Sequence, residues 1–283
     1  MTVYGGFAEN ARTPTASEIE CSSAQSPCLL PTNLAGDPPT LKQVIAHTFE
    51  LGARGRIKDG LPAGNSMYWN VSAFRTNLQD DIYGIATSVS SGYFTNIGST
   101  RRQGMETGVH YEAPTWSAYV NYSYVDATFQ SSFTTPSPSN PFQDANGNIE
   151  VSPGDRFPGI PQHRIKAGMD VKVLPNWTIG GWIKFVSDQY YVGDQSNQNA
   201  PLPSYQVVGL HSSFQPTHWL ELFAHIDNVL NAKYATYGIF SDPTGIGAPG
   251  VPVNGVTNGP GVDNRFQSPA YPFAVYAGLR LKL

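Results

Sequence analysis

The chain ends in Phe273-Ala-Val-Tyr-Ala-Gly-Leu-Arg-Leu-Lys-Leu283, a stretch in which two kinds of side chain alternate without a break. One set is apolar throughout and comprises Phe273, Val275, Ala277, Leu279, Leu281 and Leu283. The other set comprises Ala274, Tyr276, Gly278, Arg280 and Lys282. Because successive side chains of a strand point to opposite faces, this stretch predicts a strand with one apolar face and one largely polar face.

The length and the ending of this strand favour a position in a membrane. About ten residues suffice for a tilted strand to cross a bilayer. A soluble strand turns its apolar face to a core and seldom stops on a buried hydrophobic residue, whereas this one ends on Leu283. We therefore expect lipid on the apolar side and a water-filled lumen on the other.

The composition agrees with a membrane β-barrel. Only 13% of the 283 residues are charged, yet no run of eighteen apolar residues predicts a transmembrane helix. A barrel gives this average because half of each strand faces water. The formal net charge of -4 is small and spread along the chain, which argues against nucleic acid as a partner.

The same alternation predicts an all-β fold, a transmembrane antiparallel meander of about ten strands. Their approximate ranges are 2–11, 44–57, 67–83, 93–111, 116–129, 163–174, 177–191, 205–215, 219–237 and 273–283. Short connections (58–66, 112–115, 175–176, 216–218) alternate with long ones (12–43, 84–92, 131–162, 192–204, 238–272). Outer-membrane barrels have short periplasmic turns and long extracellular loops, so the C-terminus would be periplasmic.

Three tryptophans, Trp116, Trp177 and Trp219, each follow a short turn directly. All three therefore lie at one end of the predicted strands, where membrane barrels carry an interfacial aromatic girdle. The alternative is three core tryptophans in a soluble sandwich. A sandwich gives no reason for tryptophan to coincide with the short turns.

Four segments occur in an order that points to a family. Residues 226–238, Ile-Asp-Asn-Val-Leu-Asn-Ala-Lys-Tyr-Ala-Thr-Tyr-Gly, precede a long connection and the final strand. Residues 4–14 form an aromatic-rich segment ending in Arg-Thr-Pro, residues 48–54 contain Phe-Glu-Leu-Gly, and residues 96–106 contain Gly-Met-Glu. Together these segments resemble the barrel of a TonB-dependent outer-membrane receptor, over nearly the whole chain.

The resemblance implies a barrel of about 22 strands closed by an N-terminal plug. Residues 1–283 correspond only to the C-terminal part of that barrel, because the chain starts at Met1 inside a predicted strand. A signal peptide, a plug and the segment that contacts TonB are absent from the sequence. We therefore expect part of a receptor in the outer membrane, with a complete ten-stranded barrel as the competing interpretation.

The resemblance also implies active uptake of a scarce small ligand, with a siderophore-bound iron as the family's usual cargo, no enzymatic activity and no cofactor. TonB would act only through the absent N-terminal part. Outer-membrane lipid and the barrel-assembly machinery would contact this part directly. The ligand-binding residues stay unknown, and a carbohydrate or cobalamin ligand stays open. The alternatives are a small autonomous protease or adhesin, and a truncated remnant without function.

The last strand also resembles an assembly signal through the spacing Tyr276-x-Gly278-x-x-Leu281-x-Leu283. An unpaired edge strand can pair with the edge of the assembly protein while its apolar side chains stay toward lipid. Most receptors of this kind end in an aromatic residue, so Leu283 is a departure from the pattern.

Two cysteines, Cys21 and Cys28, lie in the first long connection. In an exported chain, two cysteines on one extracellular loop favour a disulfide over a pair of free thiols. A metal role is disfavoured because no histidine or second cysteine pair lies nearby at ligand spacing.

Residues 144–150 begin like a calcium loop, with Asp-x-Asn-x-Asn. Ile149 stands where such a loop needs glycine, and Asp155 stands where it needs a bidentate glutamate. A polar turn explains the segment better, and we predict no metal site.

An enzyme would need carboxylate and histidine side chains near one another on the barrel rim. His225 and Asp227 share the lumenal face of one predicted strand, whereas Asp80 and Asp81 lie near the outer end of another. These positions favour polar residues of the lumen wall, and we predict no catalytic residue.

Overall fold

The computed structural model describes residues 1–25, 28–29, 41–86, 91–137, 139–241 and 264–282. Its main element is a ten-stranded sheet formed by β1 (Thr2–Arg12), β3 (Val44–Ile57), β4 (Ser66–Gln79), β7 (Thr100–Glu112), β8 (Trp116–Phe129), β11 (His163–Leu174), β12 (Trp177–Val186), β13 (Tyr205–Thr217), β14 (Leu220–Asp227) and β17 (Ala274–Leu281). Every neighbouring pair is antiparallel, in this order. The predicted all-β antiparallel meander is therefore confirmed.

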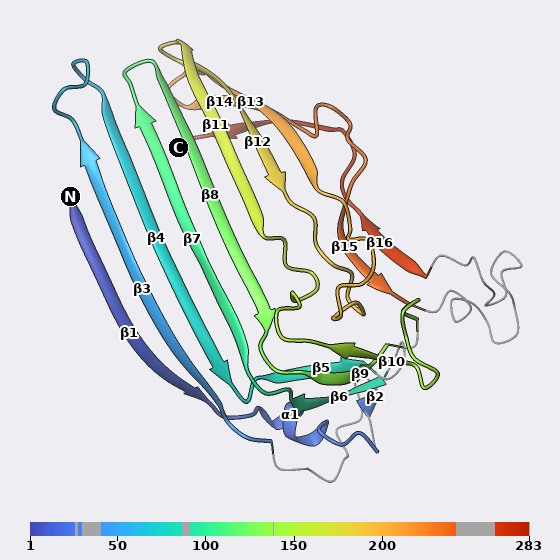
Figure 1. Cartoon of the computed structure of the whole chain (residues 1–283). Coiled ribbons are helices and arrows are strands. Elements are labelled where there is room, and N and C mark those ends of the chain that lie inside the picture. The colour runs from blue at the N-terminus through green and yellow to red at the C-terminus, as the bar shows by residue number, and fades with distance from the viewer. Residues whose placement is uncertain (26–27, 30–40, 87–90, 138, 242–263, 283) are drawn as a thin grey trace, which may run out of the picture.

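The sheet curves but does not close. The two edges are β1 and β17. Figure 1 shows the N-terminus and the short turns at one end of the sheet and the long connections at the other. The long connections carry the remaining elements: α1 (Ala16–Glu20), β2 (Cys28–Leu29), β5 (Ile82–Ala86), β6 (Ser91–Asn96), β9 (Phe133–Pro136), β10 (Asn148–Val151), β15 (Ala235–Phe240) and β16 (Arg265–Pro269). They form three small sheets, β2–β6–β5, β9–β10 and β15–β16. Among the described residues, no helix has the length and apolar character needed to cross a membrane.

Three predicted strands differ from the structure because the chain turns within them. The predicted strand 67–83 ends at Gln79, and Asp80, with φ of 51°, directs the chain into β5. The predicted strand 93–111 is divided at Gly98, with φ of 85°, and the predicted strand 219–237 at Asn228, with φ of 50°. A positive φ breaks the extended backbone, and Asp, Asn and Gly adopt it most readily.

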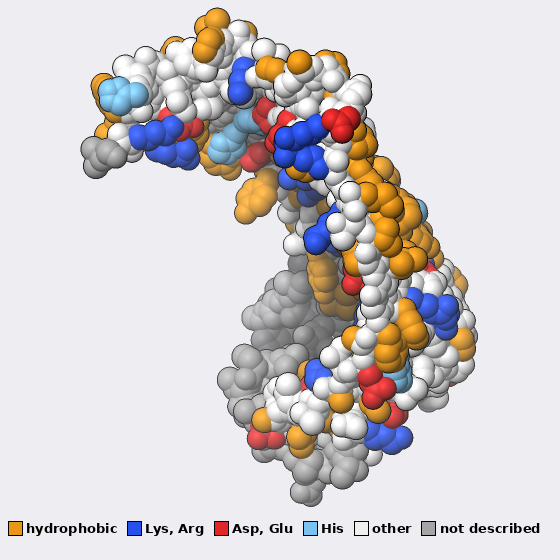
Figure 2. Space-filling view, turned by 90° about the vertical axis from the view of Figure 1, so that its left-hand side faces the viewer, with side chains coloured by type: hydrophobic (Ala, Val, Ile, Leu, Met, Phe, Trp, Pro, Cys, Tyr) orange, Lys and Arg blue, Asp and Glu red, His pale blue; other side chains and the backbone are white. Residues whose placement is uncertain are grey.

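The apolar side chains of the sheet remain exposed on one face. Leu51, Val120, Met169, Leu210 and Leu279 are 64%, 50%, 46%, 43% and 63% exposed. Figure 2 shows hydrophobic side chains along the convex side of the curved sheet, with charged side chains in its hollow. A soluble sheet would bury such residues, so the convex face has the character of a surface that contacts lipid.

Candidate functional site

The concave face of the sheet is lined by rows of directly opposed residues. One row crosses eight strands and consists of Ser66, Glu112, Ser117, Asp170, Gly180, His211, His225 and Tyr276. Directly opposed residues share a face of the sheet, so this whole row faces the concave side. The row contains no aliphatic side chain, which agrees with the predicted polar inner wall.

A hydrogen bond spans three strands of this wall. His211 Nε2 of β13 lies 2.5 Å from Asp170 Oδ1 of β11, directly over Gly180 of the intervening β12. A Cβ atom at position 180 would lie 2.2 Å from that carboxylate oxygen and 2.5 Å from the imidazole nitrogen. Gly180 is therefore required for this bond to form in its present geometry.

Basic residues of the same wall lie over aromatic rings. The Lys166 ammonium lies 6.0 Å from the centre of the Trp182 ring, and Trp182 in turn covers the backbone of Gly209. The Arg56 guanidinium lies 4.5 Å from the centre of the Tyr68 ring. Such cation–π contacts fix the rings against the wall while the charges stay accessible.

A shallow hollow lies in the wall near β1. Its lining includes Arg54, Arg56, Tyr68, Asn70, His110 and Asn121. The lining offers guanidinium and amide donors together with aromatic surface. This combination suits a polar or anionic group that occupies the lumen.

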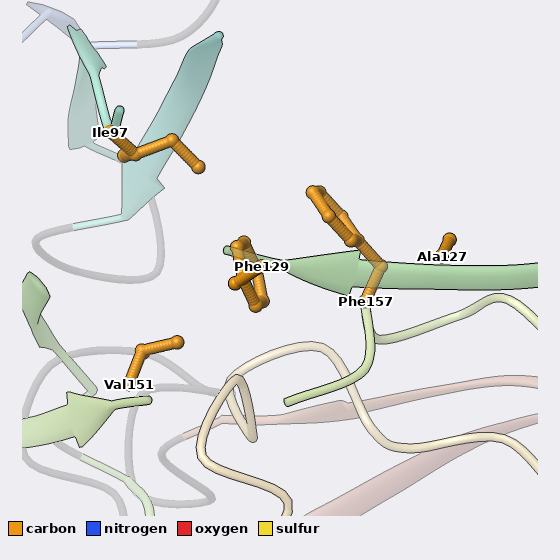
Figure 3. Close-up of a cluster of buried hydrophobic side chains, with 5 residues drawn as sticks. All are labelled: Ile97, Ala127, Phe129, Val151 and Phe157. Atoms are coloured by element: carbon orange, nitrogen blue, oxygen red, sulfur yellow. The ribbon is translucent and has the colours of Figure 1, made fainter. Parts of the chain in front are cut away.

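The long connections build a hydrophobic core of their own beside the end of β8 (Figure 3). Phe129 is fully buried, and its ring stacks on Phe157 with 4.1 Å between the centroids. Ile97, Ala127 and Val151 complete the cluster. It joins the connections between β4 and β7 and between β8 and β11, so these two loops form one packed body.

A hydrogen bond attaches a third loop to this body. The Tyr83 hydroxyl accepts a hydrogen bond from Gln195 Nε2 at 3.3 Å. Burial raises the pKa of Tyr83, although this bond acts in the opposite direction. Tyr83 therefore stays protonated at ordinary pH and serves as a structural contact between loops.

Asp194 is the centre of a buried polar network in the loop between β12 and β13. Its carboxylate accepts hydrogen bonds from the backbone N–H groups of Gln198 (3.2 Å) and Asn199 (3.1 Å) and from Asn199 Nδ2 (3.0 Å). Asn140, from the loop between β8 and β11, donates to the Gly193 carbonyl at 2.7 Å. Both Asp194 and Asn140 are fully buried. Sequence reasoning missed this network because its members are polar loop residues without periodic spacing.

The residues of the protease interpretation do not come together. Asp81 is buried and accepts hydrogen bonds from Thr100 Oγ1 (2.7 Å) and Arg102 Nη2 (3.2 Å), next to β4. His225 lies on β14, six positions away from β4 in the sheet, and stacks on Tyr276. Asp81 thus belongs to the connection after β4 and His225 to the wall, and each has its own partner.

The segment that begins like a calcium loop is a polar turn. Asp144 Oδ1 accepts hydrogen bonds from the backbone N–H groups of Asn146 (2.8 Å) and Asn148 (2.9 Å). Within the described parts of the chain, no three His, Cys, Asp or Glu side chains gather as a metal site would require.

The two cysteines approach the same strand. The Cys21 carbonyl accepts a hydrogen bond from the Phe94 N–H of β6, and Cys28 is paired with Gly92 of β6. Cys21 is buried, and none of the described cysteines is free. The side chain of Cys28 lies outside the described residues, so the disulfide between the two stays a prediction.

The three predicted girdle tryptophans all lie at the short-turn end. Trp116 stacks on Tyr111 with 4.9 Å between the centroids, and Trp177 Nε1 donates to Ser212 Oγ at 2.9 Å. Trp219 is 47% exposed. Their position at a membrane interface stays a prediction.

The predicted assembly signal lies on the edge strand β17. Leu281 is exposed on the apolar face, whereas Tyr276 stacks on His225. A Cβ atom at Gly278 would lie 2.6 Å from the Phe223 ring, so this glycine already has a packing role within the sheet. Leu283 lies outside the described residues, and recognition of this strand by assembly machinery stays a prediction.

Asn228 fixes the geometry of the turn after β14. It is 1% exposed, its side-chain oxygen accepts from the Ala232 N–H, and its amide donates to the carbonyls of Ala232 and Tyr271. These three bonds lead the chain out of the sheet and attach it to the segment that returns to β17.

Comparison with known proteins gives one family and a consistent fold. A family model described as "TonB dependent receptor-like, beta-barrel" matches residues 1–229. Among solved structures, the chain is similar to the siderophore receptor PiuA from Acinetobacter baumannii, with a TM-score of 0.64, 17% identity, and coverage of 99% of this chain and 33% of that one. The copper transporter OprC is similar with a TM-score of 0.65 and 15% identity, and the match covers 99% of this chain and 36% of OprC. The ferric yersiniabactin uptake receptor FyuA from Yersinia pestis has a TM-score of 0.62 and 18% identity, and the match covers 99% of this chain and 34% of FyuA. The chain thus spans about a third of the length of each structure.

Proposed function

This chain belongs to the TonB-dependent receptor family, whose barrel model matches residues 1–229 of its 283, and on that premise we propose that it forms the C-terminal part of a receptor's barrel wall. The observation that carries this proposal is the ten-stranded meander, apolar on its convex face, polar on its concave face and open between β1 and β17. Coverage of about a third of each similar structure supports the same view.

Members of this family are outer-membrane barrels, and we propose the corresponding placement for this chain. The convex face would contact lipid, and the short turns and the end of β17 would face the periplasm. The packed layer of long loops would then face the outside of the cell, where an incoming ligand arrives first.

We propose active uptake of a chelated metal as the activity of the receptor that contains this wall. One of the similar structures is described as a siderophore receptor, another as a ferric yersiniabactin uptake receptor, and a third as a copper transporter. Among these cargoes we favour siderophore-bound iron. Family members are transporters, which agrees with a role that involves no catalysis.

Uptake measurements in the cells that produce this chain test the proposal. The coding region of residues 1–283 is deleted, and uptake of radioactive iron from a panel of ferric siderophores and of copper ions is compared with the parent strain. We expect loss of uptake of one ferric siderophore, and the same loss in a strain without TonB. Unchanged uptake of every ferric chelate with loss of copper uptake would reassign the cargo. Unchanged uptake of all of them would refute the transport role.

A further inference from the structure

The convex face changes character close to the long-loop end of β3, β4, β7 and β8. Two successive rows of opposed residues there are Phe7, Phe49, Arg75, Gln103 and Asp126, and then Glu9, His47, Asn77, Arg101 and Thr128. They lie on the same face as the exposed apolar residues Leu51, Val71 and Met105, which are two to four positions further along the strands. The apolar surface therefore borders directly on a polar band that contains two arginines.

Asn77 holds these two arginines together. Its side-chain oxygen accepts a hydrogen bond from Arg101 Nε at 3.0 Å and a longer one from Arg75 Nε at 3.5 Å. Both guanidinium groups are bound through Nε, so their terminal N–H groups are left to bind something else. Over the described ranges, neither arginine forms an ion pair with a carboxylate.

The neighbouring carboxylates have other partners. Glu9 is bound by His47 Nε2 at 3.0 Å, and Asp80 by Lys42 Nζ at 3.5 Å. Asp126 accepts hydrogen bonds from the amides of Gln103 and Gln162, both at 3.1 Å. The guanidinium groups of Arg75 and Arg101 thus share one hydrogen-bond acceptor, Asn77, beside an apolar surface. Their mutual repulsion is screened less there than in bulk water. A bound anion would remove that repulsion.

We propose that Arg75 and Arg101, positioned by Asn77, bind the phosphate of a lipid headgroup whose acyl chains lie along Leu51 and Met105. A phosphate has enough oxygen atoms to accept hydrogen bonds from both guanidinium groups at once. The adjoining apolar wall suits acyl chains, which distinguishes a lipid from free phosphate. The proposal rests on the membrane placement of the convex face given above, and it is independent of the transported ligand.

Lipid binding to the whole 283-residue chain tests the proposal. The chain is refolded in maltoside micelles that contain either phosphatidic acid or the diacylglycerol with the same acyl chains, and bound lipid is measured by native mass spectrometry. We expect phosphatidic acid to bind roughly tenfold more tightly than diacylglycerol. The double variant R75Q/R101Q should lose this preference, and an excess of inorganic phosphate should not displace the lipid.

A matched control removes two cations from the opposite face of the same sheet. K166Q/K184Q, at two directly opposed lysines of β11 and β12, has the same change in net charge as R75Q/R101Q and should keep the preference for phosphatidic acid. If R75Q/R101Q does not fold, R75K/R101K and N77A serve instead, because both retain the two positive charges. Each should weaken the preference several-fold: R75K/R101K loses the planar guanidinium groups, and N77A loses the side chain that positions them. An unchanged preference in the outer-face variants, an equal loss in K166Q/K184Q, or displacement by inorganic phosphate would overturn the proposal.

Discussion

Replacing Asp194 with alanine should release the loop between β12 and β13 while leaving the barrel wall intact. The carboxylate is fully buried and accepts from the backbone N–H groups of Gln198 and Asn199 and from the side chain of Asn199. Asn140 still reaches the Gly193 carbonyl in the variant, so the main loss comes from the two backbone donors and the amide of Asn199. A buried donor without a partner costs about 1–3 kcal/mol, and water that enters the gap recovers part of this. We expect a net loss of about 3–5 kcal/mol in the free energy of local opening.

Hydrogen exchange measured by mass spectrometry gives the result directly. Peptides from residues 187–204 should exchange roughly a hundred to several thousand times faster in D194A, because exchange follows the free energy of local opening. Peptides from β12 and β13 should keep their protection. The control is D188A in the same loop, since Asp188 is half-exposed and forms only a 3.7 Å ion pair with Arg156. Such a pair contributes about 0–1 kcal/mol, so its loss should change exchange less than tenfold. Equal rates in D194A and D188A would refute the structural role of the buried carboxylate.

Three further predictions concern the wall, the cysteines and the last strand. G180A should break the Asp170–His211 bond and lower the free energy of unfolding in micelles by about 1–3 kcal/mol, whereas G6A, where a Cβ meets no atom within 4 Å, should have no comparable effect. Mass spectrometry of chain exported to the periplasm should find Cys21 linked to Cys28, and recovery of both thiols without reductant would contradict this. Deleting Leu283, or replacing Leu281 with Asp, should reduce the heat-modifiable folded barrel in outer membranes far more than replacing Lys282, which pairs with Glu221 on the inner face. Equal yields of the three would show that this strand is not the assembly signal.

The strands of the wall, and the face on which each side chain lies, were predictable because a single physical rule determines both. Strands with one face in lipid and one in water must alternate at every position, and the short turns between them leave no room for other structure. The ranges 44–57, 116–129 and 163–174 therefore coincide with β3, β8 and β11. The same rule places Asp170 and Lys166 on the inner face and Met169 on the outer face.

The loop layer was not predictable from these patterns. Asp80 and Asn228 interrupt predicted strands through a positive φ, which changes the direction of the chain without changing the hydrophobic period. The contacts that order the loops join positions far apart in the sequence, such as Asn140 and Asn199. Asn264 likewise donates to the Ser139 carbonyl from a different loop. Polar residues of this kind show no sign of their partners until the strands have brought the loops together.

The apolar residues of the molecule lie in two places, on the exposed convex face of the wall and in the buried core of the loop layer. The apolar side chains of the wall are exposed along the convex face, where the proposed membrane placement would give them lipid contacts in place of a core. The loop layer instead buries Phe129, Phe157 and Tyr191 within itself and joins neighbouring loops by hydrogen bonds from Asn140 and Gln195. The loops are thus ordered by their own core, whatever lies against the convex face. A ligand that arrives from the loop side would meet a surface that is already organised, so little of its binding energy would be spent on ordering the loops.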